Sequence, residues 1–309
     1  MSPPMTMRDQ ALLGASVVSG GVEAIMGGGY TPPNDDFYTY NLDTDSYTTI
    51  SVYPTTTYGG GGFGNSSGGV FFGGYATSVT QNTKEWNGIS WGAGGTLSST
   101  AGNQCLGGGT SDDGMLIGQG HVAYGSNHTY AYTSSVWSSG NTFTYYARQG
   151  AQAGTRDGSA MSITGYGGNT GGSGGAGVRA ESSTRGAFDG TWSSGSETTH
   201  KTFQQNNASG DSSSMSFAGG YSVSDPATPL DTNTNWNGSS YDNDTVMPVG
   251  TYTTVGCGSN DVEKLLCIAG TASTGYTDVA YLWDQTSWTT LATYPVACGY
   301  GSGGYYTGE

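Results

Sequence analysis

The strongest constraint on the fold of this chain is an internal repeat. Two or three mostly apolar residues followed by glycine recur at intervals of 38 to 54 residues. The first glycines of the copies are Gly27, Gly73, Gly118, Gly165, Gly219, Gly270 and Gly308. An interval of about 40 to 50 residues is typical of one blade of a β-propeller, in which each blade is a four-stranded sheet.

A second motif follows each of the first six copies, and it consists of two aromatic residues separated by a short polar turn. The pairs are Tyr40 and Tyr47, Trp86 and Trp91, Tyr132 and Trp137, Phe188 and Trp192, Trp236 and Tyr241, and Trp283 and Trp288. Three of the turns contain Asn-Gly or Asp-Gly, which tolerate the positive φ angles of tight hairpins. The motif therefore predicts a β-hairpin with an aromatic pair packed across its two strands.

A third feature is a small residue that stands 13 positions before several of the motif glycines. These residues are Gly14, Gly60, Cys105 and Cys257. A small residue that recurs in one register predicts strands crowded round a central axis. The cysteines are then compact apolar fillers and not metal ligands, and no two of the four form a Cys-x-x-Cys pair.

Each unit therefore combines a glycine-rich inner strand, an apolar strand and an outer aromatic hairpin. No stretch shows sustained helical periodicity. We expect an all-β chain that forms a single β-propeller domain over residues 1–309, with a glycine-rich loop insertion at about 167–177. The expected count is six full four-stranded blades plus a short seventh from residues 295–309, to which residues 1–7 add an outer strand. The alternative is six blades with one terminal segment outside the ring.

The repeat resembles the kelch motif in its apolar-Gly-Gly and tryptophan pattern, although it lacks the regular Arg and the Tyr-Asp pair of many kelch units. Variants such as Glu85-Trp86-Asn87-Gly88-Ile89-Ser90-Trp91 look more like the Gly/Ser/Thr-rich kelch-like repeats of marine and cyanobacterial phage virion proteins. The resemblance implies a phage tail, fibre or capsid-surface protein on the particle exterior. Its expected partners are other virion proteins or copies of itself.

Charge and hydropathy argue against several other functions. The chain carries 23 acidic and 8 basic residues, a formal net charge of −15, so it lacks the cations that nucleic acids and anionic membranes require. No apolar run reaches the 18 residues expected of a membrane span, so we expect no membrane insertion. Residues 11–18 are too interrupted for the core of a signal peptide, which fits synthesis in the host cytoplasm and later display on the virion.

Residues that could support catalysis are sparse, so we expect no enzyme. The three histidines, His121, His128 and His200, have no zinc-ligand spacing, and no catalytic or metal-binding residues are assigned. Calcium is the one ion for which the sequence offers candidate ligands, because Asp and Asn cluster at 43–46, 112–113 and 242–244. The alternative is that these residues form ordinary turns.

An aromatic residue or a histidine follows several of the motif glycines. The set is Tyr30, Tyr75, His121, Tyr166 and Tyr221. Equivalent positions in successive blades lie on one face of a propeller, and tyrosine rings on that face can stack on host-surface glycans. The alternative is that these residues pack blade against blade. The predicted function is therefore a non-enzymatic virion structural protein or, alternatively, a carbohydrate-binding adhesin or receptor-binding protein.

Overall fold

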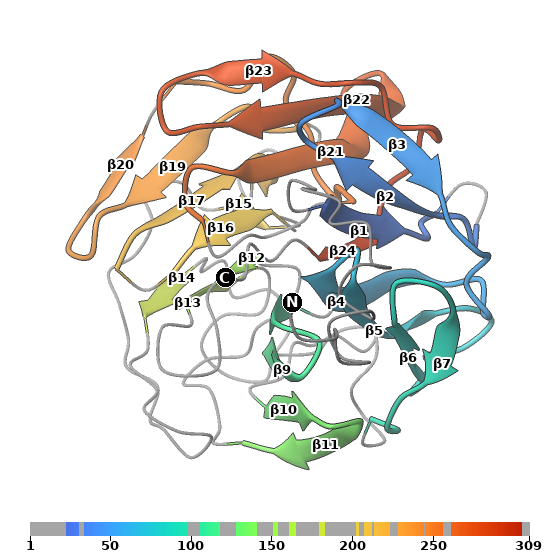
Figure 1. Ribbon diagram of the computed structural model, residues 1–309. Coiled ribbons are helices and arrows are strands. Elements are labelled where there is room, and N and C mark those ends of the chain that lie inside the picture. The colour runs from blue at the N-terminus through green and yellow to red at the C-terminus, as the bar shows by residue number, and fades with distance from the viewer. Residues whose placement is uncertain are drawn as a thin grey trace, which may run out of the picture.

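The computed structural model describes residues 23–30, 34–97, 106–117, 128–140, 151–153, 161–164, 179–182, 202–203, 207–211, 213–222, 228–243, 245–255 and 261–304. These residues form 24 strands and contain no helix, so none that could span a membrane. The strands make seven sheets, which Figure 1 shows arranged as a ring around a central axis. The prediction of an all-β propeller is confirmed.

Four of the sheets contain four strands, as predicted for a blade. The first blade comprises β24 (Ser302–Gly304), β1 (Glu23–Gly27), β2 (Phe37–Asn41) and β3 (Ser46–Thr49). The second comprises β4 (Tyr58–Asn65), β5 (Gly68–Tyr75), β6 (Thr83–Trp86) and β7 (Trp91–Ala93). The third comprises β8 (Leu106–Gly109), β9 (Asp113–Ile117), β10 (Thr129–Thr133) and β11 (Val136–Ser139). The β17 sheet comprises β16 (Ala208–Gly210), β17 (Met215–Ala218), β19 (Asn233–Trp236) and β20 (Tyr241–Asn243).

The remaining sheets are smaller. One contains β12 (Ala151–Ala153), β13 (Met161–Thr164) and β14 (Arg179–Ser182). The β21 sheet contains β21 (Leu265–Ala272), β22 (Gly275–Trp283) and β23 (Trp288–Thr290). The last pairs β15 (Thr202–Phe203) with β18 (Tyr221–Ser222).

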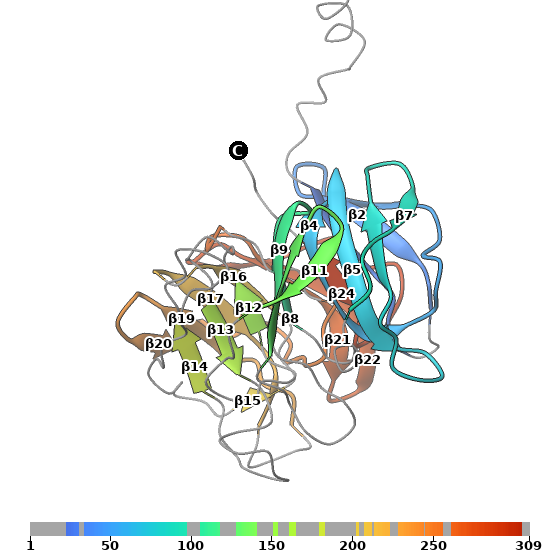
Figure 2. The same ribbon diagram turned by 90° about the horizontal axis from the view of Figure 1, so that it is seen from below.

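Five inner strands surround the axis in the order β24, β4, β8, β12 and β16, and each contacts the next (Figures 1 and 2). In the β21 sheet the corresponding position is taken by residues 251–255, which are not a regular strand. Tyr252 forms only an isolated bridge with Thr271, and the Val255 N–H donates to the Ile268 carbonyl at 2.9 Å. The described residues therefore show five blades that contain a regular inner strand. This count differs from the prediction of six full blades with a short seventh, and from the alternative of six.

The predicted short seventh blade is wrong because its strand belongs to the first blade. Residues of β24 pair antiparallel with β1, with Gly304 opposite Ile25 and Ser302 opposite Gly27. The ring is thus closed by a strand that lies far from β1 in the sequence. Residues 1–7, Gly14 and the glycine-rich segment 167–177 lie outside the described residues.

The glycines of the inner strands allow the blades to approach backbone to backbone. A Cβ atom on Gly107 of β8 would lie 2.6 Å from the Gly62 carbonyl oxygen of β4. One on Gly304 of β24 would lie 2.7 Å from the backbone of Phe63 in β4. Within the second blade, Gly60 pairs with Gly73, 13 residues later, in the predicted register. Small residues are therefore required at the axis because larger side chains would collide with neighbouring backbone.

The predicted aromatic hairpins form in five units. Trp86 and Trp91 lie directly opposite each other on β6 and β7, with ring centroids 5.2 Å apart. The pairs Tyr40 and Tyr47, Tyr132 and Trp137, Trp236 and Tyr241, and Trp283 and Trp288 have centroids 4.6 to 5.3 Å apart. The sixth pair, Phe188 and Trp192, lies outside the described residues.

Side-chain oxygens of Asn and Asp fix the turns of these hairpins. Asn87 Oδ1 accepts hydrogen bonds from the backbone N–H groups of Ile89 and Ser90 at 3.0 and 2.9 Å, while Gly88 adopts a φ of 87°. Asp284 makes the equivalent contacts with Thr286 and Ser287. The predicted turn role of such residues is confirmed at these positions, since the side chain replaces backbone partners that the turn leaves unpaired.

Candidate binding surface

Two of the five predicted glycan-binding residues can be placed with their side chains. Tyr30 follows β1 and Tyr75 is the last residue of β5. The backbone of Tyr221 belongs to β18, whereas His121 and Tyr166 lie outside the described residues.

Tyr30 and Tyr75 meet through a third ring, that of Tyr58, at one end of β4. The Tyr58 ring centroid is 4.7 Å from that of Tyr30 and 5.5 Å from that of Tyr75. Tyr300 also approaches Tyr58, with a centroid distance of 6.3 Å. We call Tyr30, Tyr58, Tyr75 and Tyr300 the tyrosine cluster. It joins the first two blades and the segment that leads into β24.

Backbone contacts hold these rings together. Tyr58 and Tyr75 are partners in the β4–β5 ladder, and Tyr30 forms a bridge with Gly299. The Gly59 N–H donates to the Tyr300 carbonyl at 2.7 Å. Because all four rings stand on paired backbone, the cluster is a formed surface and does not depend on one loop.

The cluster combines burial with exposure. Tyr30 is 40% exposed, and the other three rings are partly buried. Burial raises the pKa of Tyr58 above its ordinary value, and Tyr30 and Tyr75 raise it further. The Tyr58 hydroxyl therefore stays protonated across the physiological pH range and remains a hydrogen-bond donor.

Tyr58 and Tyr300 are not among the binding residues predicted from the sequence. Tyr58 immediately precedes the glycine run of an inner strand, and this position gives a usable signal, since the residue starting β4 must face the residue ending β5. Tyr300 joins the cluster only because β24 closes the ring. No local pattern around Tyr300 indicates that contact.

The two described cysteines, Cys267 and Cys298, are buried and form no disulfide. Burial raises the pKa of Cys298 to about 12, and it raises that of Cys267 further. Such thiols are poor nucleophiles at neutral pH, because the reactive form is the thiolate. The prediction that cysteines act as apolar fillers is confirmed for this pair, while Cys105 and Cys257 lie outside the described residues.

Asp45, one of the candidate calcium ligands, instead accepts hydrogen bonds from other residues of the protein. Asp45 Oδ1 accepts hydrogen bonds from the Tyr40 hydroxyl at 2.6 Å and from the Ala292 N–H at 2.7 Å, so it links the first blade to the segment after β23. Within the described ranges, no group of three or more His, Cys, Asp or Glu side chains is placed to hold a metal ion.

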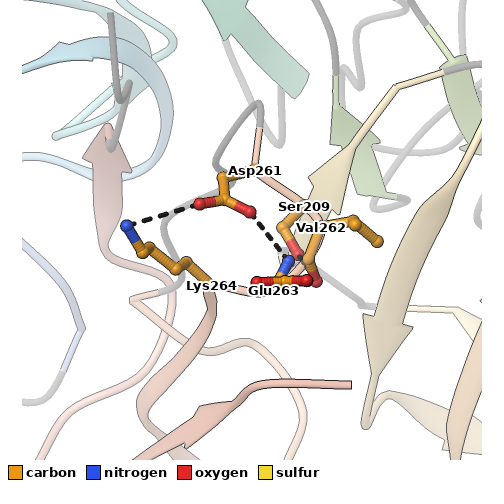
Figure 3. A network of polar contacts seen from close by, with 5 residues as sticks. All are labelled: Ser209, Asp261, Val262, Glu263 and Lys264. Carbon is orange, nitrogen blue, oxygen red and sulfur yellow. Dashed lines mark hydrogen bonds and ion pairs between the residues drawn. The ribbon is translucent and has the colours of Figure 1, made fainter.

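An ion pair lies in the turn before β21, shown in Figure 3. Lys264 Nζ is 3.3 Å from Asp261 Oδ2, and the Glu263 N–H donates to Asp261 Oδ1 at 3.0 Å. In the same turn the Val262 carbonyl accepts a hydrogen bond from the Ser209 hydroxyl of β16 at 3.5 Å. Asp261 thus shapes a turn that contacts the inner strand β16, and the Asp261 carboxylate is paired with residues of the same turn.

Comparisons with known proteins support the fold alone. No family model matches the chain, and no curated protein matches it. A solved structure titled "Structure of YjhT" is similar to it, with a TM-score of 0.69 and 12% sequence identity over 87% of this chain and 95% of that chain. At this identity the likeness shows a shared β-propeller architecture.

Proposed function

We propose that this β-propeller is a non-enzymatic binding protein that recognises carbohydrate through the tyrosine cluster. The observation that carries the proposal is the contact of four tyrosine rings at one end of β4, with Tyr30 left 40% exposed. A tyrosine ring offers an apolar face to the C–H groups of a sugar and a hydroxyl to its oxygens. The sequence-based alternative, packing between blades, is met in part by the contact of Tyr30 with Tyr58, but 40% of Tyr30 stays exposed and open to a ligand.

Glycan-array binding of the full chain tests this proposal. We expect Tyr30→Ala and Tyr75→Ala each to weaken binding of the recognised glycans about tenfold, as for loss of an aromatic contact of 1–1.5 kcal/mol. Ile89→Ala is the matched control, because Ile89 is 83% exposed on the β6–β7 turn, which lies outside the cluster. Unchanged binding in both tyrosine variants would refute the surface, and absence of glycan binding by the unmodified chain would refute the function.

We also propose that the protein is displayed on a phage particle, held by other virion proteins or by copies of itself. The resemblance of its repeats to those of phage virion proteins supports this proposal.

Immunogold labelling of purified particles with antibody to this chain tests the virion proposal. Label at the tail tip supports a receptor-binding role, and label over the capsid or along the tail supports a structural one. Particles without label, together with a purified chain that remains monomeric, would contradict it.

A further inference from the structure

A cavity of about 290 Å³ lies between the second and third blades, at the end of β4 and β5 opposite to the tyrosine cluster. The residue that starts β4, Tyr58, belongs to the cluster, and the turn that follows β4 lines the cavity. An eight-residue strand separates the two places by about 25 Å. The cavity is therefore a second site, distinct from the cluster.

The lining of the cavity is polar and carries negative charge. It includes the hydroxyls of Ser67, Ser111, Ser134 and Ser135 and the carboxylates of Glu85 and Asp112. No Lys, Arg or His belongs to the described lining. Trp86 and Val70 supply its apolar part. An anion is disfavoured here by charge, and an apolar ligand would leave the polar groups without partners.

Glu85 is held in place by the neighbouring blade. The hydroxyls of Tyr132 and Ser135 both donate to its Oε1 atom, the Ser135 bond at 2.6 Å. Burial, followed by the contact with Glu85, raises the pKa of Tyr132 well above its ordinary value, so this phenol remains a donor. Among the described residues no group donates to Oε2, which leaves a fixed carboxylate oxygen beside the cavity.

The β10–β11 turn is strained at the same place. Ser134 and Ser135 have φ angles of 49° and 65°, in the region that favours glycine. The corresponding turns of the other described hairpins place Gly88, Gly238, Asp45 or Gln285 at positive φ, and this turn has two such residues in succession, neither of them glycine. Strain of this kind persists where the surrounding structure or the function requires it. Here the two residues place hydroxyl-bearing side chains at the rim of the cavity, and Ser135 orients Glu85.

We propose that this cavity binds a single neutral sugar residue through its hydroxyl groups. A polyhydroxyl ligand both donates and accepts, so it can give hydrogen bonds to the carboxylates of Glu85 and Asp112 and exchange them with the serine hydroxyls. The volume of about 290 Å³ is just below the range of about 300–1,000 Å³ for pockets that hold drug-sized ligands, which suits one sugar ring. The inference shares its ligand class with the proposed function but uses none of the same residues.

Isothermal titration of the full chain with D-glucose, D-galactose, D-mannose and N-acetylglucosamine tests the proposal. We expect one of these sugars to bind, and we expect Glu85→Gln to weaken that binding about tenfold or more, because a hydrogen bond to a charged acceptor is lost. Gln can still accept from Tyr132 and Ser135. Asp112→Asn, at an exposed position, is a second variant that does not depend on this inter-blade contact. Asp242→Asn, on an exposed hairpin of the β17 sheet, is the matched control.

The Tyr30→Ala variant separates this inference from the proposed function. Sugar binding lost in Glu85→Gln but retained in Tyr30→Ala supports the cavity. Binding lost in Tyr30→Ala and retained in both cavity variants overturns the cavity and leaves the proposed function standing. Absence of binding by all four sugars, or binding of Ca²⁺ alone, also overturns the inference.

Discussion

The contacts between blades differ in chemistry from one side of the ring to the other. Between the first and second blades, Phe37, Tyr53, Phe71, Trp86 and Trp91 pack as a continuous aromatic cluster. Between the β17 and β21 sheets, apolar residues are accompanied by hydrogen bonds between polar side chains. Aromatic packing stabilises through buried area and tolerates small shifts, whereas buried polar groups stabilise only while every partner is in place.

The polar contacts on that second side are specific. Thr254 Oγ1 donates to Asn207 Oδ1 at 2.8 Å, in a fully buried contact between the two sheets. Ser216 Oγ donates to Asn235 Oδ1 at 2.6 Å and accepts from Gln285 Nε2 at 3.1 Å. Blades built from the same kind of repeat therefore join their neighbours by two means, and the two should respond differently to substitution.

The largest expected effect is on the aromatic side. Trp86 is buried, and its indole N–H donates to the Ser66 carbonyl at 2.8 Å. We expect Trp86→Ala to lower the free energy of unfolding by about 3–5 kcal/mol, because it leaves a cavity the size of an indole ring. Urea unfolding measures this loss, and Trp86→Phe, which keeps most of the packing, should cost less. Equal losses in the two variants would show that the hydrogen bond dominates and the packing does not.

A smaller effect is expected from Thr254→Val on the polar side. The substitution keeps the shape of the side chain but leaves Asn207 Oδ1 without the Thr254 hydroxyl. We expect a loss of about 1–3 kcal/mol, the cost of a buried group deprived of its partner. A loss near zero in urea unfolding would show that packing, and not this hydrogen bond, stabilises the contact.

The coupling of Ser216 to Gln285 should be smaller again. A double-mutant cycle with Ser216→Ala and Gln285→Ala isolates their interaction, which we expect to be about 0.5–1.5 kcal/mol. Strict additivity of the two single losses would contradict an energetic link between the β17 and β21 sheets at this point.

The smallest effect concerns the pH dependence of the Asp284 turn. Backbone N–H groups of Ser287 and Thr286 lower the pKa of this carboxylate in the folded state. Its contribution to the free energy of unfolding is therefore fully present above the unfolded pKa of about 3.9, and this contribution is lost as pH falls through the lower folded pKa. Because the group is exposed, we expect less than about 1 kcal/mol. Asp284→Asn should keep the turn, as Asn87 does in the second blade, and abolish this part of the acid dependence measured by unfolding between pH 2 and about 5. If the fall in the free energy of unfolding at acid pH is the same in Asp284→Asn, Asp284 is not a source of that fall.

The sequence predicts what is local to one repeat. The aromatic pair at Trp86 and Trp91 and the small residue at Gly60 follow from alternation, turn chemistry and register. Contacts between repeats do not, because Glu85 and Tyr132 lie 47 residues apart and nothing in either motif pairs them. The same limit explains the wrong seventh blade: the glycine-rich segment at 302–304 resembles the inner strands β4 and β8, so its sequence does not tell which blade it joins.

That segment also sets the order in which the molecule can be completed. During synthesis β1 emerges early and β24 nearly 280 residues later, so the first blade has an unpaired inner edge while the other blades are made. An unpaired edge is a template for strands of another chain. A second copy of the protein can supply its own 302–304 segment to that edge. At low concentration the segment of the same chain closes the ring. When many copies fold together, we expect exchange of this segment between chains to give oligomers.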